Sequence, residues 1–246
     1  MINTNRPAIH PVEMGSLAIM VMLLNGCSRS ADRKSIEPSN ELREVLQEDT
    51  IEGYYRAHAD FFHFATRADI PDNLEWHNGM DLPEFSSPDA QKGGAITQGL
   101  LDFPRTLRFV GPDTNRGFKD YLLKSSMQYA HKHPNVDGYY PGLAAAWSVD
   151  AEHNRVYIQI NPAAKWSDRT PITTADVLYA FYFYRSPYIQ SPVDNHDYNK
   201  RYTSVTRYSD HVFSITASGA KKDLLHHTLP LSPVPQHFFK CWVPTL

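Results

Sequence analysis

The chain contains the run Ala164-Lys165-Trp166-Ser167-Asp168-Arg169-Thr170-Pro171-Ile172-Thr173-Thr174-Ala175-Asp176-Val177, in which a polar loop leads directly into a helix. Trp166 supplies a large apolar anchor, and we expect it to be largely buried. Asp168 is placed to accept backbone N–H groups within the loop. Thr173 or Thr174 suits the helix N-cap, with Asp176 in the first turn. These residue types predict a structural role for the run and no contact with a ligand.

The segments on either side of this run have strand and helix patterns. Val156–Ile160 is typical of a strand, and the helix that begins at Thr173 is expected to reach Phe183. Tyr202–Tyr208 and His211–Ala217 alternate polar and apolar residues, which predicts a β-hairpin. The patterns also predict helices at Asn40–Thr66 and Leu224–Leu229, a turn at Trp76–Gly79 and a strand at Ala95–Leu101. The predicted fold class is therefore mixed α/β.

The amino-terminal residues predict export and lipid anchoring. Ser16–Leu24 is almost purely apolar but is far shorter than the roughly 20 residues that cross a bilayer as a helix, so it is typical of a signal-peptide core. It runs into Leu24-Asn25-Gly26-Cys27, which resembles the bacterial lipobox. We therefore expect residues 1–27 to be a lipoprotein signal peptide with Cys27 as the lipidated residue, followed by a polar tether over 28–50. The alternative is a buried apolar helix that ends at a cysteine by chance.

Composition argues against several other functions. The formal net charge of −3 leaves no electrostatic footprint for nucleic acid. The 12 histidines are scattered and lack an H-E-x-x-H motif, so we expect them at the surface and predict no metal site and no cofactor. Gly93-Gly94 is not followed by a G-K-[ST] triplet, and no G-x-S-x-G motif occurs, which disfavours nucleotide binding and esterase-like hydrolysis.

Several segments, in the same order, resemble solute-binding protein family 5, the oligopeptide and dipeptide receptors of ABC importers. The segments are Lys92-Gly93-Gly94-Ala95-Ile96, Phe103-Pro104-Arg105-Thr106-Leu107, Trp147-Ser148-Val149, and the run from Ala164 to Val177. Leu74-Glu75-Trp76 and Pro235-Gln236-His237-Phe238-Phe239 are most similar to the YejA-like branch. The positions that carry the resemblance form a fold signature: Gly93, Gly94, Trp147, Trp166, Asp168 and Asp176.

The resemblance implies a periplasmic-binding-protein-like type II fold, with a ligand held between two lobes. Family members are considerably longer, so residues 51–246 are expected to be the N-terminal part of the domain, an incomplete first lobe without the second. A truncated or frameshifted product with impaired binding is the expectation. The implied partners are a peptide or similar small ligand and an ABC permease in the inner membrane. The implied location is the periplasm, with the protein a lipid-anchored monomer and not an enzyme.

Two other functions remain open, an envelope lipoprotein hydrolase and a nonfunctional gene remnant. The ligand and the residues that contact it are not predicted. One position departs from the family pattern, because Arg169 stands where the family has glycine. If the loop requires a positive φ there, the arginine costs about 1 kcal/mol or more.

Overall fold

The computed structural model describes residues 50–87, 89–91, 93–95, 97, 99, 103, 105–106, 127–186, 189, 191–219 and 222–239. The helical elements are α3 Ile51–Ala57, the 3-10 turn η1 Arg67–Asp69, α5 Thr174–Arg185, α6 Pro192–Lys200, α7 Leu224–Thr228 and α8 Gln236–Phe239. The strands are β1 Phe62–Phe64, β2 Ala130–Lys132, β3 Tyr139–Pro141, β4 Ala144–Asp150, β5 Arg155–Ile160, β6 Tyr202–Arg207 and β7 Val212–Ala217.

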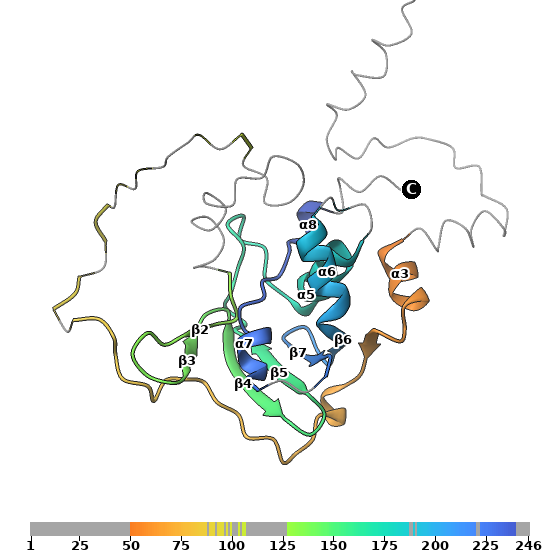
Figure 1. The fold of residues 1–246 in the computed structure, drawn as a ribbon, viewed down its shortest axis with the longest axis horizontal. Coiled ribbons are helices and arrows are strands. Elements are labelled where there is room, and N and C mark those ends of the chain that lie inside the picture. Colours follow the sequence, from red (N-terminus) through yellow and green to blue (C-terminus); the bar gives the residue numbers. More distant parts are fainter. Residues whose placement is uncertain are drawn as a thin grey trace, which may run out of the picture. The chain divides into compact units, whose positions relative to one another are not determined.

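A five-stranded sheet in the order β1-β6-β7-β5-β4 organises this part of the chain (Figure 1). The pairs β4–β5, β5–β7 and β6–β7 are antiparallel, whereas β1 joins the edge of the sheet parallel to β6. The β6–β7 pair is the hairpin predicted from the alternating pattern. The described chain combines strands and helices, so the predicted mixed α/β class is confirmed.

One face of the sheet, called here the apolar face, packs against α5, α6 and α7 (Figure 1). Its inward-facing residues are Trp147, Val156, Ile158, Ile160, Val205, Phe213 and Ile215. Val177, Leu178 and Phe181 reach it from α5, and Leu224 and Leu229 reach it from α7 and its end. The alternation of side chains along each strand sends the neighbouring residues to the opposite face.

The opposite face, called here the polar face, carries Ser148, Tyr157, Ser204, Thr206, Tyr208, Ser214 and Thr216. Most of these side chains are buried, and Tyr157, Tyr208 and Val212 pack with Ala65, Ile70 and Leu74 from the segment that follows β1. The sheet is therefore covered on both faces, by helices on one side and by an irregular segment on the other.

Residues 40–49 of the helix predicted from Asn40 to about Thr66 lie outside the described residues, and the prediction is wrong after residue 57. Thr50 caps α3 through its side chain, which accepts the N–H of Gly53 at 3.0 Å, and the helix ends at Ala57. The carbonyl of His58 then accepts the N–H groups of Phe61 and Phe62, and Phe62 starts β1. The chain leaves the helix because the sheet edge offers these aromatic residues both burial and backbone partners.

The predicted strand Ala95–Leu101 falls largely outside the described residues, and residues 95, 97 and 99 lie in no strand. The predicted turn at Trp76–Gly79 is present, with the Asn78 side chain accepting the N–H of Met80 at 3.0 Å. Gly79 has φ +66, and a Cβ there would lie 2.1 Å from the carbonyl oxygen of Tyr139. Only glycine fits this close approach to the β2–β3 hairpin.

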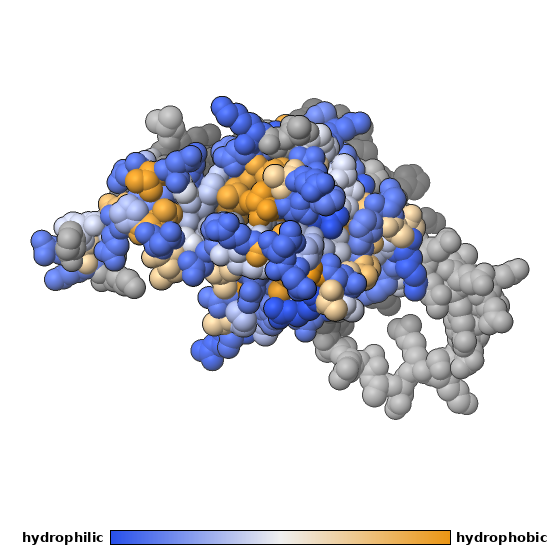
Figure 2. All heavy atoms as spheres, turned by 90° about the horizontal axis from the view of Figure 1, so that it is seen from below, coloured by the Kyte–Doolittle hydropathy of each residue, from blue (hydrophilic) through white to orange (hydrophobic). Residues whose placement is uncertain are grey.

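Some large apolar side chains stay at the surface. Figure 2 shows apolar residues gathered in patches on one face among hydrophilic ones. The large apolar side chains that are exposed in the described chain are Phe64, Trp76, Met80, Phe85, Phe103, Val136, Val149, Val193 and Phe238. No helix in the described ranges has the length and apolar character needed to cross a membrane.

Candidate functional site

The signature segment, residues 164–177, closes a loop onto the start of α5. Thr173 and Asp176 form a capping box, with the N–H of Thr173 donating to Oδ2 of Asp176 at 2.9 Å. Asp168 accepts the N–H of Thr170 at 2.9 Å, as expected for a loop carboxylate. The N–H of Arg169 donates to the carbonyl of Trp166, and the N–H of Trp166 donates to the carbonyl of Thr170. The loop is therefore a self-contained turn anchored on the helix cap.

Asp176 connects three parts of the chain although it is only 4% exposed. Its Oδ1 accepts the N–H of Gln236 at 3.0 Å, and its backbone carbonyl accepts the N–H of Val234 at 3.2 Å. The indole Nε1 of Trp166 lies 3.4 Å from its Oδ2. A buried carboxylate is tolerated because N–H donors surround it. This residue ties the segment before α8 to the start of α5.

Asp168 makes a second link to the same segment. Its Oδ2 lies 2.6 Å from Nε2 of His237, and the two side chains are 52% and 33% exposed. The Thr170 N–H, followed by the His237 contact, lowers the pKa of Asp168 below its ordinary value. The signature segment thus holds α8 through both of its carboxylates, so His237 and Gln236 are partners that sequence reasoning did not assign.

Trp166 is of intermediate burial and packs against the rim of the main core, which agrees with the expectation that it is largely buried. The nearly buried tryptophan is Trp147, which is 2% exposed on the apolar face. Its backbone exchanges two hydrogen bonds of 2.8 Å with His77, so the segment around His77 extends the edge of the sheet beside β4. At this rim the indole N–H of Trp166 faces Oδ2 of Asp176.

Arg169 has φ +72, a left-handed conformation that glycine adopts without strain. An arginine at the position where the family has glycine therefore adopts a strained backbone conformation, which meets the condition for the predicted free-energy cost. Gly93 and Gly94 have φ values of +120 and +87 and lie in exposed, irregular chain. A Cβ atom added to either glycine would have no neighbour within 4 Å. The two glycines therefore do not pack against the signature segment. Cys27 and Cys241 lie outside the described residues.

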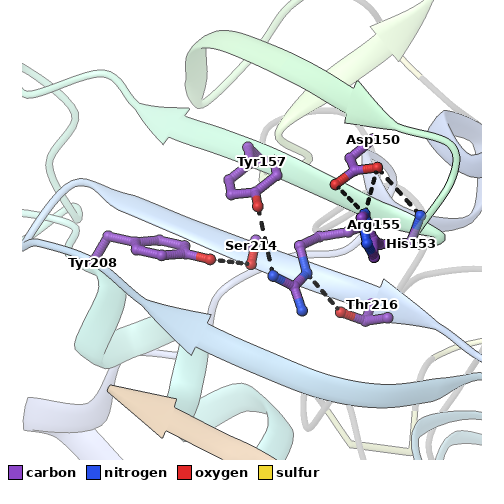
Figure 3. A network of polar contacts seen from close by, with 7 residues as sticks. All are labelled: Asp150, His153, Arg155, Tyr157, Tyr208, Ser214 and Thr216. Atoms are coloured by element: carbon purple, nitrogen blue, oxygen red, sulfur yellow. Dashed lines mark hydrogen bonds and ion pairs between the residues drawn. The ribbon is translucent and has the colours of Figure 1, made fainter. Parts of the chain in front are cut away.

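A polar network crosses the polar face near the β4–β5 turn (Figure 3). Arg155 donates from Nε to Oγ1 of Thr216 at 3.2 Å, and its Nη1 lies 3.5 Å from the hydroxyl of Tyr157. The hydroxyls of Tyr208 and Ser214 are 3.2 Å apart. Burial raises the pKa of the Tyr157 phenol above its ordinary value, so this group stays neutral at ordinary pH.

The same network includes the turn itself. The Asp150 carboxylate accepts the N–H of His153 at 3.2 Å and contacts its Nδ1 at 2.8 Å (Figure 3). The alternation of Ser, Thr and Tyr along β6 and β7 was the sequence signal for this face. The alternating pattern did not predict that the polar face is buried, since alternating polar residues usually face solvent.

The histidines are not all at the surface as expected. His133 is 4% exposed, and its Nε2 lies 2.8 Å from the carbonyl oxygen of Pro83. Its Nδ1 faces the N–H groups of Asn135 and Val136, so the ring closes the loop between β2 and β3. Within the described residues, no three His, Cys, Asp or Glu side chains are arranged to hold a metal ion.

A hollow of about 270 Å³ lies where the parallel strands β1 and β6 end. Phe64 and Arg207 are register partners at these carboxyl ends, and both line the hollow. Further walls come from α3, the first turns of α5, and Gln236 at the start of α8. In open α/β sheets, ligands bind outside the carboxyl ends of parallel strands, so this hollow is a concave candidate site within the described residues.

Residues 138–244 match the model of the bacterial extracellular solute-binding proteins, family 5 Middle. The matched range contains β4, β5, the signature segment, α5 and the β6–β7 hairpin. This match marks residues 138–244, less than half of the chain, as similar to solute-binding protein family 5. The resemblance inferred from the motifs is thereby confirmed for this part of the chain. The family is one of substrate-binding proteins and not of enzymes.

The comparisons also give the extent of the likeness. The chain is 31% identical over 124 residues to a binding protein of Brucella melitensis biotype 1, and 34% identical over 123 residues to the peptidoglycan-binding protein YepA of Agrobacterium fabrum. Each alignment covers 44% of this chain and 20% of the relative, so the match spans about a fifth of these proteins. The structure of Haemophilus influenzae OppA with the peptide RPPGFSPFR aligns over 53% of this chain and 29% of OppA, with 16% identity and a TM-score of 0.46.

Proposed function

We propose that this chain provides part of the substrate-binding component of an ABC importer for peptides or similar small ligands. The observation that carries the proposal is the family 5 match over residues 138–244, in a region whose signature segment is fully engaged in holding the fold together. Its partners would be the ligand and an inner-membrane permease, and its place the periplasm or cell envelope.

The ligand class can be narrowed within this proposal. The Agrobacterium relative is named a peptidoglycan-binding protein, which favours cell-wall fragments that carry short peptides over free peptides alone. A chimera tests this proposal directly. Residues 127–239 of this chain would replace the aligned segment of YepA, and binding of purified peptidoglycan fragments would be measured by calorimetry.

We expect the chimera to bind within about tenfold of YepA, since the exchanged segment would build the same scaffold. Circular dichroism and thermal melting would establish that the chimera is folded. A folded chimera without peptidoglycan binding would contradict the shared role. A parallel titration with a mixed tripeptide pool separates the two ligand classes.

The chain alone should bind such ligands weakly, because the matched region is about a fifth of its relatives and a ligand enclosed on one side only stays partly solvated. Titration of the full chain with the same fragments checks this. Saturable micromolar binding would show that the chain is itself a complete receptor.

Lipid anchoring through Cys27 is part of the proposal and rests on the lipobox-like tetrapeptide that ends at this residue. Cells expressing the chain would be labelled with an alkyne fatty acid. We expect label on the wild-type chain and none on Cys27→Ala, with Cys241→Ala as the matched control that keeps its label. Equal labelling of the Cys27 variant would exclude the anchor.

A further inference from the structure

The hollow at the carboxyl ends of β1 and β6 is used neither by the signature segment nor by the polar network. Arg56 and Glu52 line it from α3, and Arg207 lines it from β6. Within the described residues, Arg56 and Glu52 make no ion pair. The walls therefore hold two guanidinium groups against one carboxylate.

Arg207 is held in place and still has free donors. Its Nε donates to Oγ1 of Thr174 at 3.1 Å, and its Nη2 donates to Asp210 at 2.6 Å. No hydrogen bond within the described chain engages its Nη1, which carries two more N–H donors. A guanidinium fixed on two sides loses little freedom when it binds a further anion.

The remaining walls combine apolar surface with positive potential. Ala175 lies in the first turn of α5, a 12-residue helix whose amino end carries partial positive charge. Leu178 and Phe64 add apolar surface, and Phe64 is 58% exposed although it ends a strand. The closest buried carboxylate, Asp176, is already compensated by the N–H groups of Thr173 and Gln236.

An independent observation comes from Tyr55, which lines the same hollow and is only 8% exposed. Its hydroxyl has no hydrogen-bond partner in the described part of the chain. Leaving a buried hydroxyl unpaired costs about 1–3 kcal/mol, so such a group calls for a partner that the described residues do not supply.

We propose that this hollow binds a small organic carboxylate that carries a short apolar side chain. Arg56 and Arg207 pair with the carboxylate, the hydroxyl of Tyr55 gains its missing acceptor, and Phe64 and Leu178 contact the apolar group. The volume of about 270 Å³ suits a ligand of single amino-acid size. This site does not depend on the transport role, and no step in its argument uses the family match.

The test is a titration of the full chain with N-acetyl-L-leucine, followed through the methyl NMR signals of Ala175 and Leu178. The uncharged N-acetyl-L-leucinamide is the matched ligand, and N-acetylglycine measures the contribution of the apolar side chain. We expect saturable shifts with N-acetyl-L-leucine, and affinity about tenfold lower for the amide because the charge-assisted bonds are lost.

Arg56→Gln and Tyr55→Phe should each weaken binding, Arg56→Gln by about tenfold. Arg201→Gln removes the same charge at the residue that follows α6, which does not line the hollow, and should leave affinity within about twofold. Thermal melting of each variant checks the fold. Equal affinity for acid and amide, or an unchanged Arg56→Gln variant, overturns the proposal. Absence of shifts at about 20 mM ligand overturns it as well.

Discussion

The two faces of the central sheet are both buried, yet they are stabilised in different ways. The apolar face is filled by side chains such as Ile158, Phe213 and Ile215, all at 0% exposure, which gain by leaving water. The polar face buries Tyr157, Ser214 and their neighbours, whose hydroxyls must find partners. Burial on the first face is favourable by itself, whereas on the second each buried hydroxyl that lacks a hydrogen bond costs free energy.

The largest expected effect comes from breaking the apolar face. Phe213→Ala should lower the free energy of unfolding by about 3–5 kcal/mol, because it leaves a cavity beside Tyr129, whose ring centroid is 5.2 Å away. Urea denaturation measures the change. Phe85→Ala removes an equal ring that is 51% exposed and should cost far less. Similar losses at the two sites would mean that this face is not the main core.

A smaller effect is expected on the polar face, where one bond and not a volume is lost. Ser214→Ala should cost about 1–2 kcal/mol, since the hydroxyl of Tyr208 then lacks its partner at 3.2 Å. Tyr208→Phe removes the other half of the same pair. In a double-mutant cycle the combined variant should cost less than the sum of the two single changes. Strict additivity would show that the two hydroxyls do not interact.

Relieving strain outside both faces should stabilise the protein by about 1 kcal/mol. Arg169 is held at φ +72, and Arg169→Gly permits this conformation freely. The gain is reduced because glycine also makes the unfolded chain more flexible. Arg67→Gly, at an exposed residue of η1 without positive φ, is the matched control and should not stabilise. A lower melting temperature for Arg169→Gly would contradict the strain argument.

The smallest expected change in stability comes from Ser148, which tests whether hydrogen bonds stabilise the polar face. Ser148 is 0% exposed on the polar face, and its hydroxyl has no partner in the described chain. Ser148→Ala should therefore leave stability unchanged or raise it by up to about 1 kcal/mol, the opposite direction from Ser214→Ala. Chemical denaturation of both variants under one condition settles the sign. A clear loss for Ser148→Ala would reveal a partner for this hydroxyl.

Local sequence was sufficient wherever the partners lie close together in the chain. The capped start of α5 at Thr173, the turn that ends in Gly79 and the β6–β7 hairpin follow from short-range patterns. Each depends on backbone preferences and hydrogen bonds within a few residues. The family resemblance was likewise contained in ordered local motifs.

Only the tertiary structure decided which residues these motifs meet. Phe62–Phe64 became a strand and not a helix because β6, about 140 residues later, presents a parallel edge. Asp168 and Asp176 gained His237 and Gln236, and Arg56 and Arg207 came to share one hollow. Nothing in local sequence encodes such pairings, because burial and long-range contacts depend on how the whole chain packs. The polar side chains that sequence periodicity assigns to solvent are buried for the same reason.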